Sequence, residues 1–280
     1  MYEGLVTGKK RAIDALHHTE EGLPSIVALN AFQNDEDLDG QTHCVLRLYK
    51  DISRVNHSCR PNAIVEWDAD LGKGTLRALE DIAAGQEISI DYMAKPGQCL
   101  RGRNARRADL QRHYKFQCDC HVRRDNNNPA SENHKLRVQA LKLHRDIEST
   151  AMRQTETPEQ RRTRKISLIK DYISPLYKLG LKDGKLAWAK LKLSEYHRQG
   201  YEFAEAGPNH DHCDRCRDEQ SSRWHLDAAS EALDDAMRVH MRCCGKKHAV
   251  IKDDRKIMDQ LTYLASGLPS PVRPASDEED

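Results

Sequence analysis

The chain has 280 residues, of which 38% are hydrophobic and 32% are charged. This composition is polar for a globular protein, but Leu, Ile, Val and Tyr still recur often enough to build a core, which excludes a fully disordered chain. Because 45 Lys and Arg balance 44 Asp and Glu, the net charge of +1 argues against a protein that coats nucleic acid.

Two further properties of the sequence indicate the cellular compartment in which the protein is expected. No apolar run approaches the roughly 20 residues that cross a bilayer, and residues 1–18 lack the apolar stretch of a secretory signal. Nine cysteines are an odd number in a chain too long for a disulfide miniprotein, so we expect a reducing compartment, the nucleus, the cytoplasm or both. Metal binding is then the first role to consider for these cysteines.

The first third of the chain is predicted to form short strands. Residues 1–22 are compatible with a helix that ends at Gly22, and residues 70–74 are predicted to be the turn of a hairpin. No segment of crossover-helix length separates the β-rich runs, which favours a small antiparallel or mixed β unit over a doubly wound sheet. The runs are residues 25–30, 44–49, 63–67, 74–79 and 87–90.

After Tyr92 the pattern changes to that of helices. Residues 101–124 are rich in Arg and are typical of a solvated helix face, and residues 125–133 have the composition of a linker. We expect a helical domain over 134–266, with large and small residues spaced over 186–204 as in helical repeats, and a disordered acidic tail over 267–280. The helical stretches are residues 134–152, 159–180, 184–206, 223–243 and 249–265.

The most informative segment is Arg54-Val-Asn-His-Ser-Cys-Arg-Pro-Asn62. Its residues alone permit two interpretations: a loop whose Asn and Ser side chains bond their own backbone, or a site in which Asn56 and His57 hold a polar ligand and Cys59 a metal. Two more motifs follow it in the chain, Gly85-Gln-Glu-Ile-Ser-Ile-Asp-Tyr92 and Phe116-Gln-Cys-Asp-Cys120.

In their order and spacing, these three motifs resemble the C-terminal half of a SET domain, the catalytic unit of protein lysine methyltransferases. The resemblance covers about residues 24–124 and is closest to the SET-and-MYND-like branch, including fungal proteins with a helical C-terminal region. It implies an α+β chain: an incomplete SET-like β fold with a post-SET cysteine segment over 1–124, followed by the all-α, helical-repeat-like domain.

The resemblance also implies an activity and a set of site residues. The activity is the methylation of lysine in a protein substrate, with a histone tail as one such substrate and S-adenosylmethionine as the methyl donor. By the motifs, Asn56 and His57 hold this cofactor, Phe116 lies against its adenine, and Tyr92 is the catalytic residue between cofactor and lysine channel. Asn30 stands where the branch has an Asn shortly before an aromatic residue.

Two departures from the family pattern affect these expectations. The resemblance implies a zinc ion held by Cys59, Cys118, Cys120 and a fourth cysteine, but Arg123 stands at the fourth position and cannot ligate zinc. His121, His113 and Cys99 are the alternative fourth ligands. The Gly-rich segment with which SET domains begin is not found before Asn30, so we expect the N-terminal part of the SET domain to be missing. The chain is then either a truncated gene product or a reduced SET protein with an incomplete cofactor pocket.

Other interpretations stay open at this point. The chain could be a non-catalytic scaffold derived from a SET domain, whose helical half binds a partner, while a zinc-dependent nucleic-acid-binding protein is disfavoured by the near-zero net charge. A second metal-like pattern lies in the helical half, with free thiols as the alternative interpretation. It comprises His210, His212, Cys213, Cys216, Cys243, Cys244 and His248.

Overall fold

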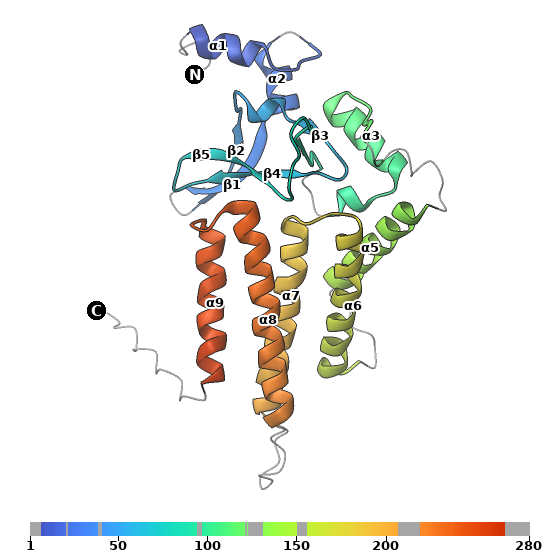
Figure 1. Ribbon diagram of the computed structural model, residues 1–280, viewed down its shortest axis with the longest axis vertical. Helices are drawn as coiled ribbons and strands as arrows, with labels where there is room; N and C mark the ends of the chain where they lie inside the picture. Colours follow the sequence, from blue (N-terminus) through green and yellow to red (C-terminus); the bar gives the residue numbers. More distant parts are fainter. Residues whose placement is uncertain are drawn as a thin grey trace, which may run out of the picture.

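The computed structural model describes residues 7–20, 22–38, 41–93, 97–120, 122, 131–149, 156–206 and 219–266. Short strands and small helices of the first part lie against one end of a group of long helices (Figure 1). The expected α+β architecture, a strand-containing part followed by a helical part, is therefore confirmed.

The strands pair in twos. β1 (Phe32–Leu38) pairs antiparallel with β2 (Gln41–Arg47), and β4 (Ala63–Asp68) pairs antiparallel with β5 (Lys73–Ala78). β3 (Asn56–His57) pairs in parallel with β6 (Ser89–Ile90), which joins two segments far apart in the sequence. The hairpin predicted at residues 70–74 is confirmed: Leu71 N–H donates to the Asp68 carboxylate at the start of the turn.

The strand predicted at residues 25–30 is wrong, because this segment forms helix α2 (Leu23–Asn30). Pro24 lies in the first turn, where its fixed φ favours a helix, and Ile26 and Asn30 are buried on one helix face four residues apart. In contrast, β1 was not predicted, because its Gln, Asn, Asp and Glu residues have low strand propensity. Pairing with β2 outweighs that preference.

The remaining helices of the first part are short. They are α1 (Thr7–Asp14), the 3₁₀ turns η2 (Ile52–Arg54) and η3 (Gln98–Leu100), and α3 (Arg103–Tyr114). α3 contains most of the Arg-rich run, but it is not only a solvated face: Arg106 is 3% exposed and donates to the carbonyl of Arg101, and Leu110 on the same helix is fully buried.

All five predicted helical stretches are helices. Ser131 and Thr157 cap the first two through their side chains, and Gly180, at a φ of 70°, follows the end of the second. Pro175 lies inside this second helix rather than ending it. The helices are α5 (Glu132–Glu148), α6 (Pro158–Lys178), α7 (Gly184–Ala206), α8 (Glu219–Cys244) and α9 (Ala249–Ala265).

The two parts share one hydrophobic core. Cys59, Leu79 and Leu110 of the first part lie in the same buried cluster as Leu176 and Leu186 of the helices. None of the described helices is both long enough and apolar enough to cross a membrane. The expected tail and residues 125–130 of the expected linker lie outside the described residues, so the domain boundaries stay a prediction.

Candidate functional site

One cleft brings together the cofactor-binding and catalytic residues expected from the sequence. It has a volume of about 1140 Å³ and lies between residues 15–18, the motif around His57 and the segment after α3. Asn30, Asn56, His57, Tyr92 and Phe116 all line it. Their common location is observed, while the ligand that each one binds stays a prediction.

The pairing of β3 with β6 builds the floor of this cleft. Asn56 lies opposite Ser89 and His57 opposite Ile90, so the first motif runs beside the strand that leads to Tyr92. The Asn62 side chain holds the two segments together, because its Nδ2 donates to the Glu87 carbonyl at 2.9 Å and its Oδ1 accepts from Ser89 N at 2.8 Å. The final Asn of the motif is therefore a structural clamp.

His57 connects this motif directly to Tyr92. Its Nδ1 accepts a hydrogen bond from the backbone N–H of Tyr92 at 3.1 Å, and its Nε2 lies 3.5 Å from the Cys59 sulfur. Burial lowers the pKa of His57, against the nearby Asp91 carboxylate that raises it, so the ring is neutral at pH 7. Since Nδ1 accepts, the single ring proton is assigned to Nε2, which faces the sulfur.

Tyr92 is held from both ends. Its hydroxyl donates to the Val55 carbonyl at 2.6 Å, and its own carbonyl accepts from the Tyr114 hydroxyl at 3.0 Å. The ring lies 4.9 Å from that of Tyr114 and 6.0 Å from that of Phe116, measured between centroids. Burial and the neighbouring Tyr114 raise the pKa of Tyr92 to about 12, so the phenol remains protonated at neutral pH.

Asn56 and Asn30, two of the asparagines that line the cleft, have different environments. Asn56 is exposed, and its Nδ2 donates to the Glu87 carboxylate at 2.7 Å. Asn30 is buried, and its Nδ2 donates to the backbone carbonyls of His17 and Ile26 at 2.6 and 2.8 Å. Asn30 therefore ties α2 to the segment that forms one edge of the cleft, and its amide hydrogens are already occupied.

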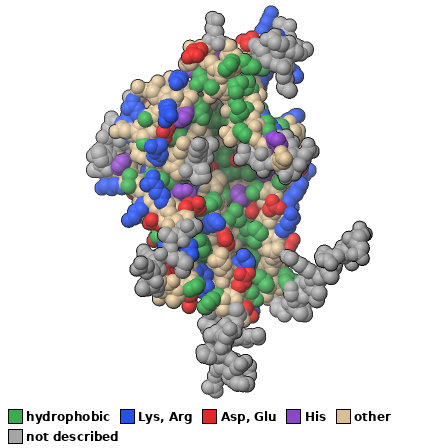
Figure 2. Space-filling model, turned by 180° about the vertical axis from the view of Figure 1, so that it is seen from behind, with side chains coloured by type: hydrophobic (Ala, Val, Ile, Leu, Met, Phe, Trp, Pro, Cys, Tyr) green, Lys and Arg blue, Asp and Glu red, His purple; other side chains and the backbone are tan. Residues whose placement is uncertain are grey.

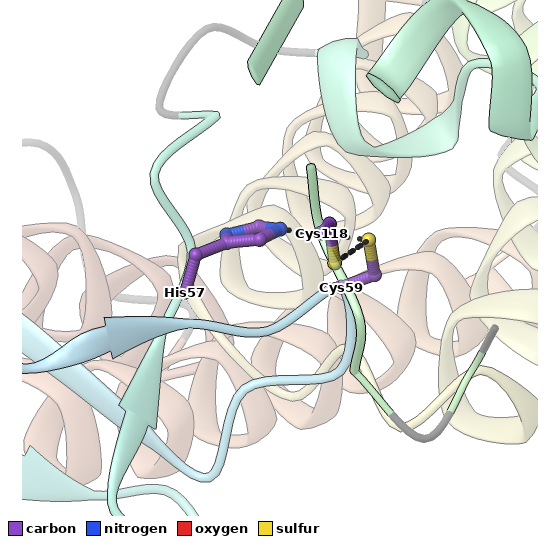
Figure 3. A group of neighbouring side chains, drawn as sticks. All are labelled: His57, Cys59 and Cys118. Atoms are coloured by element: carbon purple, nitrogen blue, oxygen red, sulfur yellow. Dashed lines mark hydrogen bonds between the residues drawn. The ribbon is translucent and has the colours of Figure 1, made fainter. Parts of the chain in front are cut away.

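A cluster of cysteines lies beside the cleft. Figure 3 shows Cys59, from the loop after β3, and Cys118, from the segment after α3, side by side next to His57. The Cys59 and Cys118 sulfurs are 3.9 Å apart, and the Cys118 and Cys120 sulfurs are 3.3 Å apart. The three zinc ligands expected from the sequence are thus brought together.

The Cys59 and Cys118 sulfurs lie at about the separation expected for two ligands of one tetrahedral metal ion, whereas Cys120 lies close to Cys118 but outside the group of mutually near ligand atoms. Two sulfurs at about 2.3 Å from one zinc ion lie roughly 3.8 Å apart, and the two measured distances lie on either side of this value. Hydrogen bonds from Cys118 and Cys59 lower the pKa of Cys120, which favours the thiolate that a metal requires.

A fourth ligand for a zinc ion at these cysteines is less evident. Among the described residues, His57 is the one whose ligand atom lies within 4.8 Å of both the Cys59 and the Cys118 sulfurs, and Cys120 is not part of this group. Nε2 of His57 carries the ring proton as long as Nδ1 accepts from Tyr92, so His57 would have to give up that hydrogen bond to ligate. His113 and Cys99 are not in this group, and positions 121 and 123 lie outside the described residues.

The sequence did not point to two residues at the site. Tyr114 lines the cleft and holds the carbonyl of Tyr92, and its place two residues before Phe116 was the available signal. Arg106 borders a small cavity with the three cysteines. Nothing in the Arg-rich run distinguished it from its exposed neighbours.

Comparison with known proteins gives a consistent result for the first part of the chain. The SET domain family model matches residues 11–93. The chain is 38% identical over 73 residues to human "Histone-lysine N-methyltransferase SMYD3", which is 26% of this chain and 16% of that protein. It is 36% identical over 70 residues to "Histone-lysine N-methyltransferase set5" of Schizosaccharomyces pombe, 25% of this chain and 21% of that protein.

A third relative is chicken "Protein-lysine N-trimethyltransferase SMYD5", 42% identical over 73 residues, which is 26% of this chain and 17% of that protein. The matched segment thus spans only 16% to 21% of the length of these three relatives. The residues that match the SET domain family model include Asn56, His57 and Tyr92.

Proposed function

We propose, because residues 11–93 match the SET domain family model and the similar relatives are protein-lysine methyltransferases, that the chain transfers a methyl group from S-adenosylmethionine to a lysine side chain of another protein. The observation that carries the proposal is the common cleft of Asn56, His57, Tyr92 and Phe116. A nuclear or cytoplasmic location belongs to the same proposal.

The cleft fits such a cofactor in size and lining. Its volume of about 1140 Å³ is at the upper end of small-molecule sites, which run to roughly 1,000 Å³. The rings of Phe116 and Tyr114 offer aromatic faces for an adenine, and the exposed Asn56 amide offers polar atoms at the rim. When bound, S-adenosylmethionine supplies an electrophilic methyl group on its sulfonium sulfur.

The residues of the chain prepare the lysine that receives this methyl group. Free lysine has a pKa of about 10.4 and attacks only as the neutral amine. The partly buried rings of Tyr92, Tyr114 and Phe116 disfavour the ammonium form, so they help it lose its proton to solvent. The amine then forms the N–C bond as the C–S bond breaks.

Tyr92 acts by orientation in this proposal. Its pKa of about 12 makes its phenol a poor base at neutral pH, and its hydrogen is directed at the Val55 carbonyl. The phenol oxygen and that carbonyl are therefore fixed acceptors, which aim the amine at the methyl group. Orientation of this kind contributes up to roughly 7–11 kcal/mol to lowering a barrier.

The proposal also includes a class of substrate and a structural metal ion. Histone tails are the first substrates to test, because SMYD3 and set5 carry histone-lysine methyltransferase in their names. Cys59, Cys118 and Cys120 would hold a structural zinc ion, which would fix the segment carrying Phe116 against the cleft.

Calorimetric titration of the chain with S-adenosylmethionine and S-adenosylhomocysteine tests the cofactor assignment directly. We expect binding in the micromolar range and clearly weaker binding for Asn56→Ala. Asp70→Ala, which alters an exposed pair with Lys252 away from the cleft, is the matched control and should bind like the wild type. No detectable heat from the folded wild-type chain would contradict the proposal and favour a non-catalytic SET-derived scaffold.

A further inference from the structure

The connection between α6 and α7 contacts the cleft region at three places. A Cβ atom at Gly180 would lie 2.4 Å from Nε of Arg60, so the Arg60 side chain packs directly on this glycine. Lys182 Nζ lies 3.4 Å from the Glu80 carboxylate. Arg60 and Glu80 both line the cleft, so this connection supports its wall from the helical part.

The third contact is the most buried. Lys185, in the first turn of α7, lies 3.2 Å from Oδ2 of Asp91 and 2.6 Å from Oδ2 of Asp183. The three side chains are 17%, 10% and 7% exposed, respectively. One largely buried ammonium therefore lies between two largely buried carboxylates, and its removal would leave both negative charges without a positive partner.

Asp91 connects this lysine to the reaction centre. It directly precedes Tyr92, and its Oδ1 accepts from the backbone N–H of Met93 at 2.9 Å. The same oxygen lies 3.9 Å from Nδ1 of His57, the atom that accepts the Tyr92 N–H. The Asp91 carboxylate thus holds the backbone that follows Tyr92, while Lys185 holds the carboxylate.

We propose that Lys185 is a positioning residue for methyl transfer, through which the helical part sets the place of Tyr92 in the cleft. The inference deepens the proposed function and rests on it for its effect on catalysis. Its structural half, the control of the Tyr92 backbone by Lys185, stands separately and can be measured without turnover.

The alternative is that Lys185 only neutralises the two carboxylates. Lys185→Met removes the positive charge and keeps a side chain of similar length. A triple variant, Lys185→Met with Asp91→Asn and Asp183→Asn, removes all three charges. The triple variant should fold even if the single variant does not, because it leaves no unpaired buried carboxylate. Lys192→Met is the matched control, because Lys192 lies on the same helix in a more exposed pair with Glu195.

The first readout is hydrogen exchange in the full chain, followed by mass spectrometry. In the triple variant we expect the peptide covering residues 89–93 to exchange about tenfold faster, with α8 and α9 unchanged, because the loss is local. Unchanged exchange at 89–93, or equal acceleration throughout the chain, would overturn the positioning role. Lys192→Met should leave this peptide as in the wild type.

The second readout is turnover. We expect the triple variant to lose roughly 10- to 100-fold in kcat with little change in KM for S-adenosylmethionine, since misplacement of Tyr92 affects alignment more than binding. Wild-type kcat in the triple variant would overturn the inference. If the wild-type chain itself shows no turnover while local exchange responds as expected, the proposed function fails and the structural coupling stands.

Discussion

The hydroxyl of Tyr92 makes one short hydrogen bond, to the Val55 carbonyl, and this bond defines a prediction at the scale of one residue. Tyr92→Phe keeps the ring against Tyr114 and Phe116 but removes the fixed phenol oxygen. We expect methyl transfer to fall about 100-fold, because orientation of the amine is lost. The free energy of unfolding should fall by about 1 kcal/mol.

Steady-state methylation and chemical denaturation measure these two effects. S-adenosylhomocysteine should bind Tyr92→Phe nearly as well as the wild type, which separates orientation from cofactor binding. Tyr177→Phe, on the exposed side of α6, is the control for a generic loss of a phenol. Wild-type turnover in Tyr92→Phe would remove Tyr92 from the proposed role.

At this scale the sequence predicted which residues meet but not which atoms remain available. The positions of Asn30 and His57 along the cleft followed from motifs. The amide hydrogens of Asn30 are already donated to His17 and Ile26, and Nδ1 of His57 is already used by Tyr92. These partners are backbone groups brought in by tertiary folding, and a motif carries no information about them.

The segment after α3 gives a prediction at the scale of one element. It has no regular structure from Gln117 to Cys120, so its position depends on the contacts of Phe116 and of the cysteines. We expect about one zinc ion per purified chain, bound by three thiolates, and we expect Cys118→Ser to lose it. Metal removal should also weaken cofactor binding, because metal binding and local folding are coupled.

Metal analysis of the purified chain, before and after a chelator, tests this. Cys44→Ser is the control, because Cys44 is an exposed free cysteine on β2 outside the cluster. A wild-type chain that contains no zinc when prepared with zinc present would contradict the metal assignment. Cofactor binding that is unaffected by the chelator would contradict the coupling to Phe116.

Among the elements, sequence reasoning succeeded where the local pattern and the tertiary environment agree. The hairpin of β4 and β5 has turn residues between two β-rich runs, and α5 to α9 have apolar residues at helical spacing. It failed for α2, where an apolar run of Ile, Val and Leu resembles a strand, although Pro24 begins a helix. Short apolar runs do not distinguish a buried strand from one buried helix turn.

At the scale of the whole molecule, Arg137 on α5 connects the two parts. It is 1% exposed, and its guanidinium donates to the carbonyls of Cys59 and Cys99. One carbonyl belongs to the first motif and the other to η3. We expect Arg137→Met to lower the free energy of unfolding by about 2 to 4 kcal/mol, because two buried carbonyls lose their partner.

Thermal and chemical denaturation check this value. Arg145→Met, an exposed position on the same helix, is the control for loss of one positive charge. If Arg137→Met unfolds like the wild type, the two parts do not depend on this contact. Separate unfolding of the two parts in Arg137→Met would support it further, because their shared core would then be divided.

The distribution of charge also belongs to this scale. Seen from behind, the molecule has Lys and Arg side chains along both edges and hydrophobic side chains along the middle (Figure 2). On this face the positive charge is not gathered into one stripe. The near-zero net charge predicted no strong general attraction to nucleic acid, but only the structure could show how the charges are arranged in space.

We expect a pair of histidines between α7 and α8 to make the stability of the fold depend on pH. Nδ1 of His197 lies 3.1 Å from Nδ1 of His225, and His197 is 1% exposed. Burial, His225, and the positive charges of Lys170 and Arg162 on α6 lower the pKa of His197 to about 4. In the unfolded chain its pKa is about 6.5.

Between these two values the unfolded state binds more protons than the folded state, so the stability from neutral His197 is complete above pH 6.5 and is lost as the pH falls to about 4. We expect the free energy of unfolding to decrease over this range, and His197→Gln to reduce the slope. Urea denaturation at several pH values measures this, with His43→Gln, exposed on β2, as the control. Equal slopes in His197→Gln and the wild type would show that His197 is not buried in its neutral form, because a buried neutral histidine must contribute a proton-linked loss of stability.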